Sequence, residues 1–112
     1  MILNISKQNE LLKNQKQRKG TLKEIGFNRV LCKLGISLEK ISSEDIEITE
    51  DRQKELKKLF ENKYVEWNNN KSEKLLLECI GTLEALTFIG IKVPVPQNFV
   101  EEDLYNRCSS YP

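Results

Sequence analysis

The feature that most constrains the fold is the stretch of about 71–89, which is apolar on almost every side of a helix. Its apolar residues are Leu75, Leu76, Leu77, Cys79, Ile80, Leu83, Ala85, Leu86, Phe88 and Ile89. A helix of this kind is buried by neighbours on several sides. The stretch before it, about 50–68, is apolar on one side only, and a run of three asparagines separates the two. We therefore predict an antiparallel helix pair, 50–68 and 71–89, with Leu83 in the core and Leu83→Asp unfolding the domain.

The rest of the chain supplies further helices and one extended piece. Helical spacing of apolar residues ends in a glycine that suits a left-handed stop, in the series Phe27, Val30, Leu31, Leu34 and Gly35. Residues 45–49 alternate polar and apolar, which predicts a short extended segment. Residues 93–96 read Val-Pro-Val-Pro and must be extended, because each proline disfavours helix at the residue before it. After them we predict a last helix, capped by Asn98 and carrying Val100, Leu104 and Cys108.

These elements predict one all-α domain over residues 1–112. The length suits a single domain, and a hydrophobic content of 38% is enough to build its core. Residues 1–20 form a basic N-terminal segment, for which a flexible arm and an ordered helix both stay open. Residues 21–108 form the helical core. The predicted architecture is a small helical bundle built on the antiparallel pair, with the short extended segment near 45–49.

The composition argues against most enzyme chemistry. The chain has no histidine, which removes the commonest general base and the commonest transition-metal ligand. Its three cysteines show no zinc-ligand spacing, and there is no P-loop or Gly-x-Gly-x-x-Gly motif. Carboxylates at 44–47 and 101–103, and the thiol of Cys32, remain candidates, but acids in the first turn of a helix usually serve the helix dipole. We predict a non-enzymatic protein with no cofactor and no metal.

No segment reads as an export signal or a membrane span. The apolar start gives way at once to Asn4, and the longest apolar stretch, 75–91, is interrupted by Glu78 and Glu84. The odd number of scattered cysteines suits reduced thiols. We therefore expect a cytoplasmic protein with no membrane partner.

The sharpest surface feature is a basic segment near the N-terminus. Residues 1–33 carry a net charge of +6, while the chain as a whole carries +1. Lys13, Lys16, Arg18 and Lys19 lie in a stretch without apolar residues, so they are candidate contacts for nucleic-acid phosphates or for an acidic partner. The alternative is an ordinary solvated helix face, since no aromatic residues are interleaved for base stacking.

Residues 30–42 resemble the DNA-binding helix-turn-helix. Gly35 lies at the turn, followed by apolar Ile36, a capping Ser37 and apolar Ile41. In that family the second helix enters the major groove. The segment departs from the pattern in two ways. The residue four before the glycine is a leucine rather than a small residue, and the second helix carries three acids and one lysine.

Tyr64 and Trp67 form an aromatic stripe with two interpretations. Both residue types favour protein interfaces, which makes them candidate partner contacts, but the same helical spacing suits core positions. The absence of catalytic equipment, the small size and the uneven charge predict a protein that binds another protein as a regulator, adaptor or inhibitor. A composition rich in Lys, Asn, Ile and Glu is typical of AT-rich genomes and of phage or mobile-element proteins directed at host machinery. Nucleic-acid binding is the alternative function, and a homodimer stays open.

Overall fold

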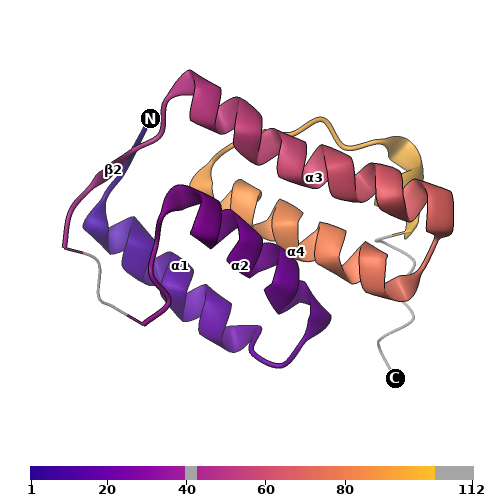
Figure 1. The fold of residues 1–112 in the computed structure, drawn as a ribbon, viewed down its shortest axis with the longest axis horizontal. Coiled ribbons are helices and arrows are strands. Elements are labelled where there is room, and N and C mark those ends of the chain that lie inside the picture. Colours follow the sequence, from indigo (N-terminus) through magenta and orange to yellow (C-terminus); the bar gives the residue numbers. More distant parts are fainter. Residues whose placement is uncertain (40–42, 103–112) are drawn as a thin grey trace.

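The computed structural model describes residues 1–39 and 43–102, and it confirms the predicted all-α class. Its elements follow the order β1 (Ile2–Leu3), α1 (Ile5–Gln17), α2 (Leu22–Leu34), β2 (Ile46–Glu47), α3 (Glu50–Asn70) and α4 (Glu73–Ile89). Residues 97–102 are again helical. The extended segment predicted near 45–49 contains β2, which pairs antiparallel with β1 at the N-terminus. Figure 1 shows α4 in the middle of the molecule, with α3 on one side of it and α1 and α2 on the other.

Capping residues explain where the two long helices begin and end. The hydroxyl of Thr49 accepts a hydrogen bond from the N–H of Arg52, which caps α3 as its sequence suggests. Lys71 then adopts a left-handed conformation with φ of 55°, and the hydroxyl of Ser72 caps α4 by accepting from the N–H of Leu75. The turn therefore lies two residues later than the predicted boundary of 68, and the two helices run antiparallel as predicted (Figure 1).

The most extensive helix packing is between α2 and α4, not between α3 and α4. Two glycines explain this close approach. A Cβ placed on Gly81 of α4 would overlap the backbone carbonyl of Lys23 on α2, and one on Gly26 of α2 would overlap the carbonyl of Glu78 on α4. Because each helix places a glycine at the crossing, the two backbones lie almost in contact, which a larger residue at either glycine would prevent.

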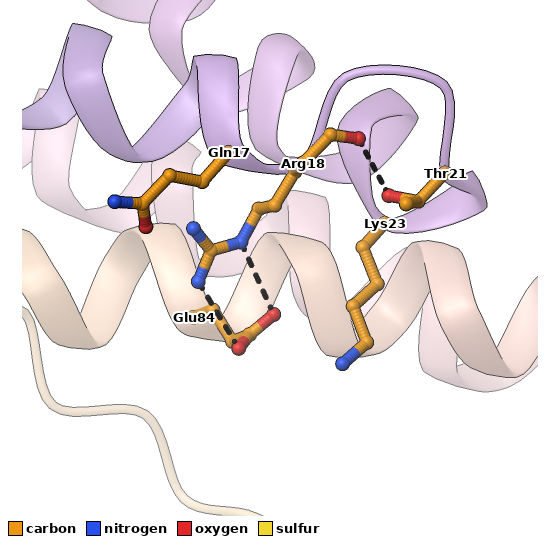
Figure 2. A pocket seen from close by; sticks show the side chains of 5 residues that line it. All are labelled: Gln17, Arg18, Thr21, Lys23 and Glu84. Carbon is orange, nitrogen blue, oxygen red and sulfur yellow. Dashed lines mark hydrogen bonds and ion pairs between the residues drawn. The ribbon is translucent and has the colours of Figure 1, made fainter.

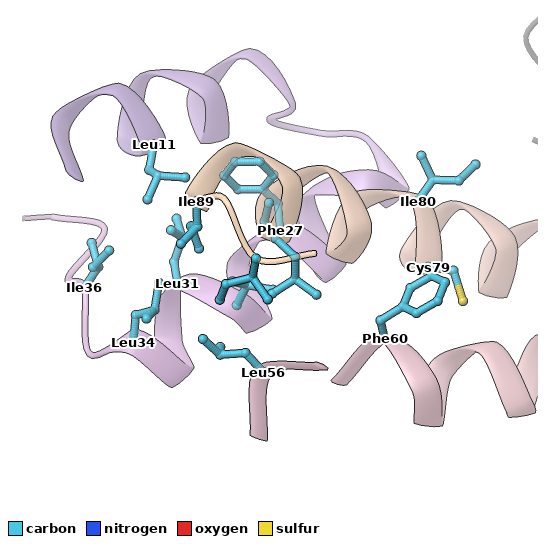
Figure 3. Close-up of a cluster of buried hydrophobic side chains, with 14 of the residues drawn as sticks. Leu11, Phe27, Leu31, Leu34, Ile36, Leu56, Phe60, Cys79, Ile80 and Ile89 are labelled. Atoms are coloured by element: carbon cyan, nitrogen blue, oxygen red, sulfur yellow. The ribbon is translucent and has the colours of Figure 1, made fainter. Parts of the chain in front are cut away.

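The core is built around α4 and is mostly leucine, isoleucine and phenylalanine. Figure 3 shows Phe27, Leu31, Leu56, Phe60 and Ile89 meeting from α2, α3 and α4. Leu86 is fully buried, whereas Leu83 is only partly buried. Leu83 therefore packs against the edge of the core rather than at its centre, and it also lines a groove at the surface. The expected unfolding of Leu83→Asp stays a prediction.

The chain after α4 returns along α3 and is fastened there by an aromatic cluster (Figure 1). Phe99 is fully buried, with its ring 5.3 Å from that of Phe60, 5.6 Å from Trp67 and 6.3 Å from Tyr64. The hydroxyl of Tyr64 also donates a hydrogen bond of 2.7 Å to the side-chain carbonyl of Asn98. These contacts tie residues 91–102 to the C-terminal half of α3.

The N-terminal segment is an ordered helix, which decides between the two alternatives left open by the sequence. The side chain of Asn4 caps α1 by accepting from the N–H of Lys7. Leu11 is fully buried, and the amide of Gln8 donates to the carbonyls of Leu3 and Glu44 at 2.8 Å each. Burial of one face of α1 thus fixes the helix to the rest of the domain.

The described part of the chain does not form the second helix of a helix-turn-helix. Gly35 does end α2 in a left-handed conformation, and Ile36 is buried. However, residues 37–39 and 43–45 are not helical, and the hydroxyl of Ser37 accepts only from the N–H of Glu39. Residues 40–42, and Leu104 and Cys108 of the predicted last helix, lie outside the described residues.

Candidate functional site

Of the four basic residues predicted to contact nucleic acid or an acidic partner, three are exposed and the fourth forms an ion pair within the domain. Lys13, Lys16 and Lys19 are exposed, and within residues 1–39 and 43–102 none of them has an acidic partner. Arg18 instead points at Glu84 of α4, with its Nε and Nη2 atoms 3.4 and 3.2 Å from the two carboxylate oxygens (Figure 2). The guanidinium also stacks over the ring of Phe27, 4.7 Å from the centroid. Arg18 therefore links α1 to α4 and is engaged within the domain.

The two aromatic candidates belong to the interior. Trp67 is 3% exposed, and its ring packs edge-on against that of Phe99. Tyr64 is partly buried beside it, and its hydroxyl is engaged by Asn98. Since both side chains bind residues of the same chain, the core interpretation of the stripe is the one that the structure supports.

Two acids and one thiol, those of Glu78, Glu66 and Cys79, are engaged within the domain or buried in it. The buried carboxylate of Glu78 on α4 lies 3.6 Å from Arg29 of α2 and 4.0 Å from Lys63 of α3, so one acid joins three helices. Lys63 also donates to Glu66 at 2.8 Å, and this hydrogen bond lowers the pKa of the Glu66 carboxyl. Burial raises the pKa of the Cys79 thiol to about 12, so this group remains protonated and unreactive at neutral pH.

An apolar groove lies where α4 ends and the chain turns back. It has a volume of about 500 Å³ and is lined by Leu83, Thr87, Gly90, Ile91, Lys92, Val93 and Val95. Gly90 adopts a left-handed conformation with φ of 98°, which ends α4 and sends the following residues back beside it. One wall of the groove is therefore a helix and the other is an extended segment.

A smaller polar pocket lies where the end of α1 and the start of α2 meet α4. It has a volume of about 300 Å³ and is lined by Gln17, Arg18, Thr21, Lys23 and Glu84. The pocket shares no lining residue with the groove. In Figure 2, Gln17 and Lys23 flank the Arg18–Glu84 ion pair. Because Glu84 already pairs with Arg18, the pocket does not offer this guanidinium to an anion.

One lysine lines the groove. Lys92 is exposed, and no acid within the described residues pairs with it. Its neighbours Ile91 and Val93 point toward the core, so the ammonium group stands at the rim of an apolar surface. An apolar cavity beside an unpaired charge is an arrangement that binds a partner with an apolar side chain and an acid.

Comparisons of the chain with protein-family models, with curated proteins and with solved structures found no match. The helices formed by residues 1–39 and 43–102 are all too short or too polar to cross a membrane. In the same part of the chain, no three Cys, Asp or Glu side chains gather as a set that could hold a metal ion.

The groove was not predicted from the sequence, although one part of it has a sequence signal. The Val-Pro-Val-Pro segment indicated extended chain after α4. What the pattern could not show is that this segment returns beside Leu83 and Thr87, since that depends on the anchoring of Phe99 against α3.

Proposed function

We propose that this protein is a non-enzymatic binding protein that takes up an apolar segment of another protein in the groove between α4 and residues 91–95. The observation that carries the proposal is the groove itself, which joins an apolar lining to a lysine that pairs with no acid of the described residues. Trp67 and Tyr64 have internal roles, which leaves the groove as the surface best suited to a partner. A protein that binds in this way acts as a regulator, adaptor or inhibitor.

The energetics of the groove suit a specific but reversible interaction. Burying one Val, Leu or Phe side chain contributes about 1.5–3 kcal/mol, which is a factor of roughly ten to a hundred in affinity. A volume of about 500 Å³ holds at least one such side chain. An acid on the partner would pair with Lys92 at the exposed rim, where it adds more to specificity and association rate than to affinity.

The proposal is tested by selecting binders from a random-peptide library displayed on phage. We expect the enriched peptides to combine an apolar residue with a nearby acid. Leu83→Asp and Thr87→Arg should each lower their affinity at least tenfold, because the first places a charge in the groove and the second fills it. Titration calorimetry measures the affinities, and circular dichroism checks that each variant is folded.

A matched control is Val65→Asp, which introduces the same charge at a side chain 55% exposed on α3. We expect this variant to bind the peptides as the native protein does. Peptides that bind equally well to Thr87→Arg and to the native protein, or a selection without any binder, would refute the proposed function. Thr87 is exposed, so this variant tests the groove without threatening the fold.

Nucleic-acid binding is the second candidate, favoured by the three unpaired lysines near the N-terminus. Lys13, Lys16 and Lys19 are all exposed, while Arg18, the fourth predicted contact, is engaged by Glu84. Each lysine that contacts phosphate contributes about 0.9 to the slope of log affinity against log salt. Replacing all three by glutamine should therefore reduce that slope by roughly 2.7 if they bind duplex DNA.

The control for this experiment changes the net charge equally at another place. Lys54, Lys58 and Lys74 are exposed on α3 and α4 and also lack acidic partners among the described residues. Fluorescence anisotropy with a labelled duplex, measured over a range of salt, compares the two triple variants. Equal slopes for both would mean that only net charge attracts the DNA. Sedimentation equilibrium of the protein alone tests whether it forms a homodimer.

A further inference from the structure

The extended segment that forms one wall of the groove has unpaired backbone groups. The N–H of Ile91 donates to the carbonyl of Leu86 at 2.9 Å, which completes the end of α4. Among the described residues, the N–H groups of Val93 and Val95 make no hydrogen bond. Pro94 and Pro96 have no N–H to donate. The only strands of the described chain, β1 and β2, pair with each other and leave this segment alone.

The unpaired groups lie on one edge of the segment. Ile91, Val93 and Val95 pack toward the core, while Lys92 and Pro94 are exposed, so the side chains alternate with a period of two as in a strand. In such a chain the N–H groups of alternate residues point to the same edge. The edge shared by residues 92, 94 and 96 is blocked by its two prolines. On the other edge the N–H of Ile91 is bonded to α4, and beyond it the N–H groups of Val93 and Val95 have no backbone partner in the described part of the chain.

We propose that the edge with Val93 and Val95 pairs with an extended segment of the partner protein, which adds to residues 91–95 as a β-strand. This inference rests on the proposed function and names the form that the partner takes in the groove. The N–H groups of Val93 and Val95 donate to backbone carbonyls of the partner. One of its apolar side chains enters the groove, and an acid pairs with Lys92.

The backbone favours an extended partner over a helical one. A helix satisfies its own carbonyls internally and has none to offer to Val93 and Val95, except at its end. Along one edge of an extended peptide, the carbonyls come from every second residue and are about 6.6 Å apart. This spacing matches that of two N–H donors two residues apart in another extended segment. Strand addition to an exposed edge is an established mode of peptide recognition, in which backbone hydrogen bonds give affinity and side-chain pockets give specificity.

The test compares two substitutions at one residue, with the peptides selected on phage as the probe. Val95→Pro removes the N–H and trims the side chain, whereas Val95→Ala trims the side chain and keeps the N–H. We expect Val95→Pro to bind at least tenfold more weakly than Val95→Ala, as measured by titration calorimetry. Pro94→Ala restores a donor on the blocked edge only and should bind as the native protein does.

Amide hydrogen exchange of the native protein gives a second measurement that needs no substitution. On peptide binding, we expect the Val93 and Val95 amides to become protected from exchange. Equal affinities of Val95→Pro and Val95→Ala together with unprotected amides, or a helical bound peptide, would overturn strand addition. If Thr87→Arg still weakens the binding of the selected peptides in that case, the proposed function stands and only the strand addition is wrong. A library without binders overturns both.

Discussion

We expect Gly81→Ala to lower the free energy of unfolding by about 3 kcal/mol or more, one of the two largest effects of a small substitution in this protein. The new methyl group would overlap the backbone carbonyl of Lys23, and a backbone atom cannot rotate away as a side chain can. Relief requires α2 and α4 to separate, and these helices share the most extensive interface of the domain. Chemical denaturation in urea measures the loss.

The sign of this effect is what makes it informative. In an exposed helix the same change would stabilise by up to about 1 kcal/mol, because alanine has the higher helix propensity. Gly26→Ala, on the opposite helix, should be similarly destabilising, since its methyl group would overlap the carbonyl of Glu78 and the side chain of Thr82. Thr87→Ala, at an exposed position of α4, should change stability by less than about 0.5 kcal/mol. A Gly81→Ala protein as stable as the native one would show that α2 and α4 lie farther apart.

The second large effect is expected for Phe99→Ala, which should lose about 3–5 kcal/mol of unfolding free energy. The ring is fully buried and lies against Phe60, Tyr64 and Trp67, so its removal leaves a cavity at the centre of the aromatic cluster. Urea denaturation measures the loss. The fluorescence of Trp67, the only tryptophan, should also shift to the red as water reaches its ring.

Phe88→Ala is the matched control, because it makes the same chemical change at a partly exposed ring. Phe88 lies on α4 beneath the ammonium group of Lys7, 4.2 Å from the ring centroid, and outside the aromatic cluster. Its loss should cost clearly less and leave the Trp67 emission unchanged. Equal losses for the two variants would contradict the anchoring role of Phe99. Since Phe99 holds residues 91–102 to α3, it also sets the position of the groove wall at Val93 and Val95.

The hydrophobic period and the turn residues of the sequence were sufficient for the class of fold and for most of its elements. Both long helices, the left-handed stop at Gly35 and the extended segment around β2 lie within a few residues of their predicted positions. These features depend on neighbours within one or two turns of the same helix, so a local pattern contains the information. The shift of the α3–α4 turn to Lys71 and Ser72 is small for the same reason.

Apart from the antiparallel pairing of α3 and α4, the contacts between elements were decided by the tertiary structure. Arg18 belongs to a basic run in the sequence, yet it is neutralised by Glu84, which lies 66 residues away. Leu83 belongs to an apolar run, yet it faces the groove because the chain that covers that side of α4 leaves a gap there. The need for glycine at positions 26 and 81 becomes visible only when α2 and α4 are seen to cross there. Charge pairing, burial and close approach are properties of residues distant in sequence, and a single helix pattern does not contain them.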